Sequence, residues 1–293
     1  MESNVERRTQ VPFCSGRDFP KNLIPEGACD SHHHIYDPVR FPYVDTDKRN
    51  QPPSTVDCYK LLKAKLGTTR SVVIQPSAYG LDNRCTLDAV KQLGTDVTRA
   101  IVVVDPTVTD EELTRMNALG AKGIRFNMNC GYKGEWSELR KLVERVAAFN
   151  WCVCLWMDPD LLVEKKDFFG SLPAQLVFDH RGHLPKNVGI NHPAFKIICQ
   201  WLDEGKAWVK LSGNYIDTVE PDYKDTVAVG RAYAKTNPNR LLWGTDWPHP
   251  SCYSGLKPLP NDSLMLDQLM EQVQDDKIFH KTLVENPAQL FGF

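Results

Sequence analysis

Four ionisable residues, far apart in the chain, are candidates for shared chemistry. His32 and His34 alternate with His33, and because side chains along a strand alternate between faces, His32 and His34 point the same way. Two imidazoles side by side can bind a metal or polarise an oxygen. His180 and Asp246 each follow a short apolar run. A carboxylate such as Asp246 could be a general base, a metal ligand or a turn cap, and three histidines at similar positions favour a functional role.

The segments that carry these residues predict where they lie. Short apolar, β-branched runs occur at residues 28–35, 71–75, 100–104, 122–126, 151–157, 175–179, 207–211 and 240–244. Between or after them, helical spacing occurs at residues 56–66, 87–93, 113–119, 137–149, 192–204, 222–235 and 262–274. Eight strands alternating with helices predict an α/β fold, a distorted (β/α)8 TIM barrel, with catalytic groups at the carboxyl ends of its strands. A doubly wound open sheet is the competing architecture, but no glycine-rich phosphate loop follows the first strand.

The chain organisation and composition narrow the function. We expect residues 1–26 to form an N-terminal arm and residues 27–293 to form one barrel domain. A net charge of −2 argues against a nucleic-acid partner, and no apolar run is long enough for a membrane span. The amino terminus lacks the pattern of a secretory signal. The nine cysteines are scattered, so we expect reduced thiols and a cytoplasmic location.

The motifs together resemble a known family. Asp30-x-His32-x-His34, Asp179-His180 and the run 243–248 (Trp-Gly-Thr-Asp-Trp-Pro) resemble the amidohydrolase superfamily, in particular its branch of pyrone-dicarboxylate lactonases, sugar-lactone hydrolases and galactarolactone isomerases. The resemblance runs from about residue 27 to the carboxyl terminus. It implies an enzyme that opens a lactone ring, with catalytic groups on strands one, six and eight.

The resemblance leaves the metal content to be decided. Amidohydrolases commonly add a histidine from strand five and a lysine from strand four, but neither is present at those strand ends. One zinc ion held by His32, His34, His180 and Asp246 is an alternative, since a catalytic zinc needs at least three good ligands. We favour a metal-free site with no cofactor.

In that site each residue has an expected role. Asp246 would accept a proton from water, and His32, His34 and His180 would donate hydrogen bonds to the developing oxyanion. Arg125 would clamp a substrate carboxylate. Further hydrogen bonds to the substrate are expected from Ser77, Tyr79, Asn127, Tyr215 and Arg181, and His249 would reach the leaving hydroxyl.

The expected substrate is a small carboxylated lactone. A pyrone dicarboxylate would need more cations than this chain offers near strands four and seven, which favours a sugar-acid lactone with a single acid group. A lactone isomerase and a zinc-dependent hydrolase or decarboxylase are the alternatives. A non-enzymatic binding protein is disfavoured by four ionisable groups at one rim, and a homo-oligomer is compatible with the sequence.

Overall fold

The computed structural model describes residues 7–44, 51–128, 134–253 and 257–293 and shows one parallel barrel. Eight strands pair in sequence order, from β1 to β8, all parallel. Their bounds are β1 Cys29–His33, β2 Arg70–Ile74, β3 Thr98–Val102, β4 Ala121–Met128, β5 Cys152–Met157, β6 Leu176–Phe178, β7 Ala207–Ser212 and β8 Leu241–Gly244. The predicted (β/α)8 barrel is confirmed, and every strand overlaps a predicted segment.

Backbone hydrogen bonds join the last strand to the first. The Asp246 amide donates to the His32 carbonyl, and the His34 amide donates to the Trp247 carbonyl, both at 2.7 Å. A Cβ on Gly244 would lie 2.6 Å from the His32 amide nitrogen, so only glycine allows this close approach. The closure therefore fixes Asp246 directly beside the two strand-one imidazoles.

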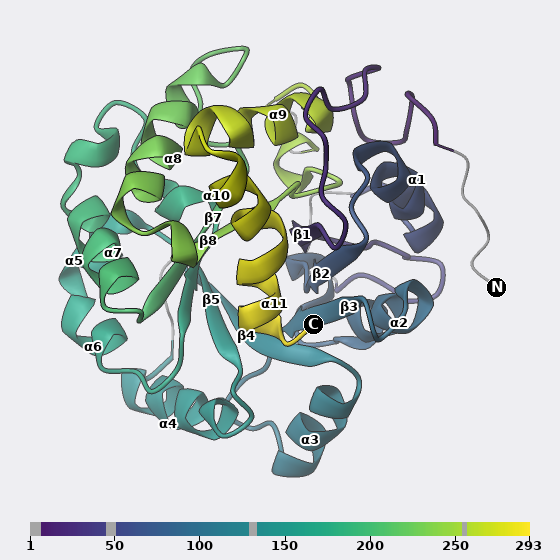
Figure 1. The fold of residues 1–293 in the computed structure, drawn as a ribbon. Coiled ribbons are helices and arrows are strands. Elements are labelled where there is room, and N and C mark those ends of the chain that lie inside the picture. The colour runs from purple at the N-terminus through teal and green to yellow at the C-terminus, as the bar shows by residue number, and fades with distance from the viewer. Residues whose placement is uncertain (1–6, 45–50, 129–133, 254–256) are drawn as a thin grey trace.

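Helices surround the strands, as Figure 1 shows. Their bounds are α1 Val56–Leu66, α2 Arg84–Leu93, α3 Asp110–Ala118, α4 Trp136–Ala147, α5 Pro159–Glu164, α6 Lys166–Gly170, α7 Pro193–Asp203, α8 Lys224–Thr236, α9 Asp262–Val273, α10 Asp276–His280 and α11 Asn286–Phe291. Seven match predicted helices, while α5, α6, α10 and α11 are too short to give a clear helical period. Gly67 ends α1 in the left-handed conformation, as its position predicts.

The core has two layers. Alternate strand residues fill the barrel interior, among them Ile74, Cys152, Cys154 and Trp208, and Phe291 of α11 packs beneath them. The other face of the strands packs against the helices. The barrel is thus filled at its amino-terminal end, which leaves the carboxyl-terminal end for the site.

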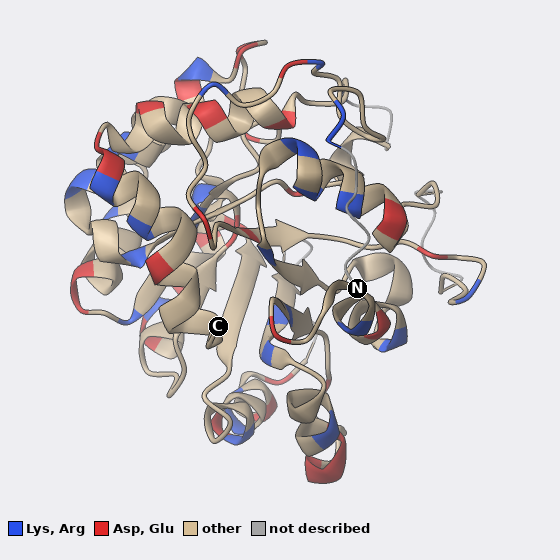
Figure 2. Ribbon diagram, turned by 45° about the vertical axis from the view of Figure 1, so that its right-hand side comes forward, with Lys and Arg blue, Asp and Glu red and all other residues tan. Residues whose placement is uncertain are grey.

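Charged residues of both signs lie on the outer helices, and the N-terminal arm packs against two of these helices. Acidic and basic residues are interspersed over the helices (Figure 2). Residues 7–26 contain no helix or strand and contact α1 and α9, through Arg7 to the Lys65 carbonyl and through Lys21 to Asp267. No helix among the described residues is long and apolar enough to cross a bilayer. Eight cysteines lie within the described residues and all are free thiols; Cys130 lies outside them.

Candidate active site

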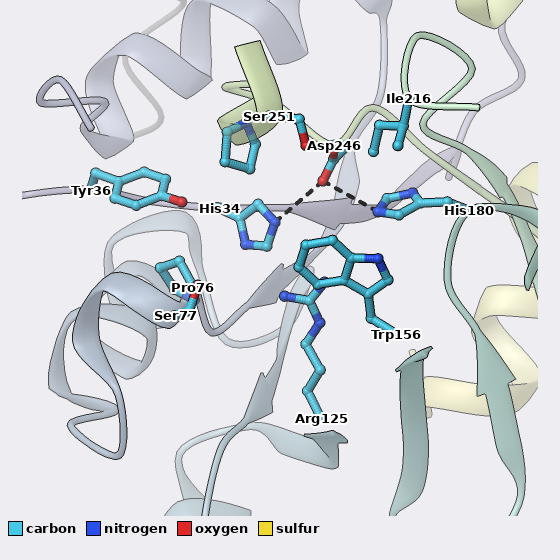
Figure 3. A pocket seen from close by; sticks show the side chains of 11 residues that line it. His34, Tyr36, Pro76, Ser77, Arg125, Trp156, His180, Ile216, Asp246 and Ser251 are labelled. Carbon is cyan, nitrogen blue, oxygen red and sulfur yellow. Dashed lines mark ion pairs between the residues drawn. The ribbon is translucent and has the colours of Figure 1, made fainter. Parts of the chain in front are cut away.

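Asp246 lies at the centre of the predicted cluster. Its Oδ1 atom is 3.3 Å from Nε2 of His34, 3.4 Å from Nε2 of His32 and 3.7 Å from Nε2 of His180. Each of these four side chains is at most 2% exposed. Figure 3 shows His34 and His180 pointing at the carboxylate from opposite sides. The structure thus brings together all four residues predicted to be catalytic.

The backbone around the cluster is unusual. Asp246 and His180 have φ values of +63° and +48°, in the left-handed region that non-glycine residues seldom adopt. A Cβ on Gly213 would lie 2.5 Å from Nδ1 of His180, so a glycine is needed at that position for the ring to sit where it does. Such strain persists only where the surrounding structure holds it, and it concentrates at functional sites.

Asp30 supports the cluster from below. It accepts hydrogen bonds from the amides of His32 and Thr245, and from the hydroxyls of Thr245 and Tyr59 at 2.7 and 3.0 Å. Burial raises the pKa of Asp30 to about 6 against the lowering effect of these bonds. Since Thr245 precedes Asp246, Asp30 connects the first strand to the loop after the eighth strand, which carries Asp246.

The second oxygen of Asp246 has a separate partner. Oδ2 accepts a 2.6 Å hydrogen bond from the hydroxyl of Tyr215. Burial alone would raise the pKa of Asp246, but the imidazoles of His180, His34 and His32 outweigh it and lower the pKa well below the usual range. Asp246 is therefore a carboxylate at neutral pH.

The imidazole nitrogens that face away from Asp246 also have hydrogen-bond partners. Nδ1 of His34 lies 2.8 Å from the Ile74 carbonyl, and a carbonyl only accepts, so this nitrogen carries a proton. Nδ1 of His180 lies 2.9 Å from the Ser212 hydroxyl. Burial lowers the pKa of His180 to about 4, against the raising effect of Asp246. Burial and Lys210 likewise lower the pKa of His32.

A metal ion can be tested against this geometry. Ligand atoms of His32, His180 and Asp246 all lie within 4.8 Å of one another, a donor set of the kind that zinc takes. A zinc-bound imidazole normally donates its other N–H to an acceptor. Nδ1 of His32 has such an acceptor in Oδ1 of Asp179 at 3.3 Å, but it also lies 3.2 Å from the ammonium of Lys210. The residues match zinc in kind, but the buried ammonium beside Nδ1 of His32 would repel a second cation bound at Nε2 of the same ring.

Of the predicted substrate-binding residues, Arg125 and Ser77 line the central pocket. The pocket has a free volume of about 20 Å³, room for about one water molecule. Nε of Arg125 donates to Oδ2 of Asp179 at 3.2 Å, and its guanidinium lies 5.2 Å from the centre of the Trp156 ring. Figure 3 shows this guanidinium directed toward the cluster. Asp179 and Trp156 therefore hold the Arg125 guanidinium at the wall of the pocket.

A second cavity adjoins the first and shares Ser77 and Arg125 with it. It has a volume of about 250 Å³, and Asn127 lines it. Its apolar lining comes from Val103, Val104, Phe126 and Met128. Asn127 thus lies beside the substrate pocket rather than at its centre.

Three other predicted residues lie away from the pocket lining. The Tyr79 hydroxyl accepts from the Asp37 amide at 2.7 Å. Arg181 donates to the Ser212 carbonyl and to Asn214, both at 2.7 Å. His249 is fully buried against Asp262 at 3.2 Å. This placement revises the prediction that Tyr79, Arg181 and His249 contact the substrate, since none of the three lines the central pocket and each bonds to other protein groups. Tyr215 is revised too, because its hydroxyl binds Asp246.

Sequence reasoning gives no role to Ile216, Ser251 or Lys210, whereas it considers Tyr36 and Trp156 as pocket residues and favours ordinary packing for them. Tyr36, Trp156, Ile216 and Ser251 line the pocket, and Asp179 and Lys210 lie beneath it. The aromatic and aliphatic residues carry no distinctive signal. Lys210 does, because a lysine within the apolar strand Ala207–Ser212 must find a partner if it is buried.

The fold and site together define an amidohydrolase-type barrel, and comparison with known proteins agrees. Residues 29–293 match the amidohydrolase family, so the chain belongs to that family. It is 33% identical to a 4-sulfomuconolactone hydrolase of Rhizobium radiobacter, over 96% of this chain and 97% of that protein. It is 30% identical to a D-galactarolactone isomerase of Agrobacterium fabrum, over 93% of each chain. A crystal structure of a probable 2-pyrone-4,6-dicarboxylic acid hydrolase from Acinetobacter baumannii superposes with a TM-score of 0.79, at 25% identity, over 91% of this chain and 100% of that one.

Proposed function

We propose that this protein is a lactone hydrolase that opens the ring of a carboxylated substrate without a metal ion. The observation that carries the proposal is the contact of one buried carboxylate oxygen, Oδ1 of Asp246, with three imidazole nitrogens. Such an arrangement places a base and several potential hydrogen-bond donors around one reacting carbonyl.

The reaction follows from these roles. Water attacks the lactone carbonyl carbon as Asp246 takes one of its protons, and the carbonyl oxygen becomes an oxyanion that accepts hydrogen bonds from the imidazoles. The intermediate then reforms the carbonyl as the ring C–O bond breaks. The leaving oxygen takes the proton from Asp246, and the product is a hydroxy acid that releases one proton at neutral pH.

His34 faces Asp246 with the ring nitrogen that is not bonded to the backbone. Its Nδ1–H is committed to the Ile74 carbonyl, so a neutral His34 would face Asp246 with a bare Nε2 lone pair at 3.3 Å. Two acceptors repel at that distance. In the metal-free reaction, Nε2 of His34 can donate to the oxyanion only when this nitrogen also carries a proton.

Substrate binding would then activate the base. In the free enzyme the imidazoles stabilise the charge on Asp246 and lower its pKa. When a lactone carbonyl enters, these donors turn to its oxygen, and Asp246 loses part of that stabilisation. The carboxylate becomes more basic at the step in which it takes a proton from water. The imidazoles then stabilise the transition state more than they stabilise the ground state.

The proposed substrate is a lactone with one carboxylate near Arg125. The 250 Å³ cavity beside Arg125 would hold the rest of the molecule. Because Val103 and Val104 line that cavity, it favours an apolar or unsaturated substituent over several hydroxyls, which is against the sugar-acid lactone expected from the sequence. A sugar-acid lactone and a pyrone dicarboxylate remain the two reference substrates.

The free thiols of the described cysteines fit a reducing, cytoplasmic location.

A lactone isomerase is the second candidate, favoured by the similarity to the D-galactarolactone isomerase. In that reaction a substrate hydroxyl replaces water as the nucleophile, and the same residues would serve. Hydrolysis releases acid, whereas isomerisation does not.

The test is a panel of pyrone, muconate-type, aldonic and aldaric lactones in weakly buffered indicator solution. We expect one proton per molecule consumed, with an apolar carboxylated lactone preferred. Consumption without proton release, seen by NMR, would establish the isomerase instead. Failure to convert any lactone of the panel, by a folded protein, would refute both.

A further inference from the structure

Lys210 is a buried cation beneath the catalytic cluster. It lies on β7 inside the barrel and is fully buried. Nζ is 3.0 Å from Oδ1 of Asp179, 3.2 Å from Nδ1 of His32 and 3.9 Å from Sγ of Cys154. Burial alone would lower the pKa of Lys210, but Asp179 and Cys154 outweigh it and raise the pKa above the usual value. The ammonium thus makes an ion pair with Asp179 and hydrogen bonds with His32 and Cys154.

This contact determines which nitrogen of His32 carries the proton. An ammonium has donors but no lone pair, so a hydrogen bond between Lys210 and His32 makes Nδ1 the acceptor and places the proton of the neutral ring on Nε2. Nε2 faces Oδ1 of Asp246 at 3.4 Å, where an N–H is favourable.

The opposite tautomer has a possible acceptor but pairs poorly. Oδ1 of Asp179 is 3.3 Å from Nδ1 of His32 and could accept its proton. That arrangement would turn an N–H toward the ammonium of Lys210 and a bare Nε2 toward the Asp246 carboxylate. Donors and acceptors match on both sides of the ring only when Nε2 is protonated.

We propose that Lys210 is a positioning residue that holds His32 as the Nε2–H tautomer, ready to donate to Asp246 or to the substrate oxyanion. Asp179 holds Lys210 in place with Oδ1 and accepts from Arg125 with Oδ2. One buried carboxylate therefore aligns both a catalytic imidazole and the substrate clamp. The effect on turnover rests on the proposed function, whereas the tautomer does not.

The tautomer is measured directly by two-bond 1H–15N NMR of protein labelled at histidine. The His32 signals are assigned by their loss in His32→Gln. We expect wild-type His32 to show a protonated Nε2 and a bare Nδ1. In Lys210→Met, Oδ1 of Asp179 is the remaining polar contact of Nδ1 among the described residues, and we expect the ring proton to move from Nε2 to Nδ1. A wild-type His32 with a protonated Nδ1 would overturn the proposal, and this result needs no variant of Lys210 to fold.

Turnover and metal binding give independent measurements. In Lys210→Met we expect kcat to fall roughly 10- to 100-fold with little change in KM, the usual size for a group that orients a functional imidazole. The bare Nε2 should also bind zinc more tightly than the wild type does, measured by equilibrium dialysis. Lys65→Met is the matched control, because Lys65 is equally buried but contacts Cys14 and the Gly16 carbonyl. Full kcat in folded Lys210→Met would overturn the positioning role, and inactivity of the wild type on every lactone would refute the function alone.

Discussion

The hydroxyl of Tyr215 donates a 2.6 Å hydrogen bond to Oδ2 of Asp246, on the side of the carboxylate away from His34. Burial, and then the charge of Asp246, raise the pKa of Tyr215 well above its usual value, so the phenol remains a donor. Tyr215 thereby fixes the rotation of the carboxylate and leaves Oδ1 for the imidazoles and the reaction.

Tyr215→Phe should therefore slow catalysis without unfolding the barrel. Without the hydroxyl, Asp246 can rotate away from the imidazoles, and we expect kcat to fall roughly 10- to 100-fold. Steady-state kinetics on the best lactone of the panel measure this. Tyr233→Phe is the control, because its hydroxyl is equally buried but donates to the Arg181 carbonyl. Equal losses in the two variants would argue for a general packing effect.

Arg125→Met should weaken binding of the acid group. Hydrogen bonds to a charged group contribute about 1.5–3 kcal/mol each, so we expect kcat/KM for an acidic lactone to fall at least about 10-fold. The methyl ester of the same lactone should lose much less. Arg140→Met provides the control, since this exposed arginine also stacks on an aromatic ring, that of Phe168. An equal loss for acid and ester would remove Arg125 as the carboxylate clamp.

The catalytic cluster could be predicted because its residues follow apolar strand segments, and parallel strands bring their carboxyl ends together. Contacts between long side chains could not be predicted. Tyr215 is predicted to touch substrate but turns to Asp246, and Arg181 turns to the backbone of residues 212 and 213. The directions of these side chains depend on the backbone of the loops after β6 and β7. In the loop after β6, His180 and Arg181 have positive φ values, which the sequence pattern does not reveal.

The pH dependence of stability should report on His180. Its pKa in the folded protein is lowered from 6.5 to about 4. Between these values the unfolded chain takes up a proton that the folded protein does not, so the free energy of unfolding decreases as the pH falls. The slope contributed by one such group is at most about 1.4 kcal/mol per pH unit. His180→Gln should make the dependence shallower in this window.

Urea unfolding at several pH values from about 4.5 to 7 measures the slope. His280→Gln serves as the control, because His280 is 47% exposed and pairs only with Glu285 among its described contacts. An unchanged slope in His180→Gln would contradict the lowered pKa of His180.

Chelation should leave the activity unchanged. The ammonium of Lys210 beside His32 disfavours a zinc ion at the cluster. We expect dialysis against a strong chelator to preserve kcat, and elemental analysis to find far less than one metal ion per chain. Loss of activity on chelation, restored by one equivalent of zinc, would show that His32, His34, His180 and Asp246 hold a catalytic metal.

Asp246→Asn tests the central claim most directly. The substitution keeps the size of the side chain and removes its charge. Asp267→Asn is the control, because the same change is made there in a carboxylate that accepts hydrogen bonds from the N-terminal arm. With the urea unfolding curve close to that of the wild type, we predict a fall in kcat of roughly 10²–10⁴-fold, the usual contribution of a general base. A kcat within a few-fold of the wild type would contradict the account.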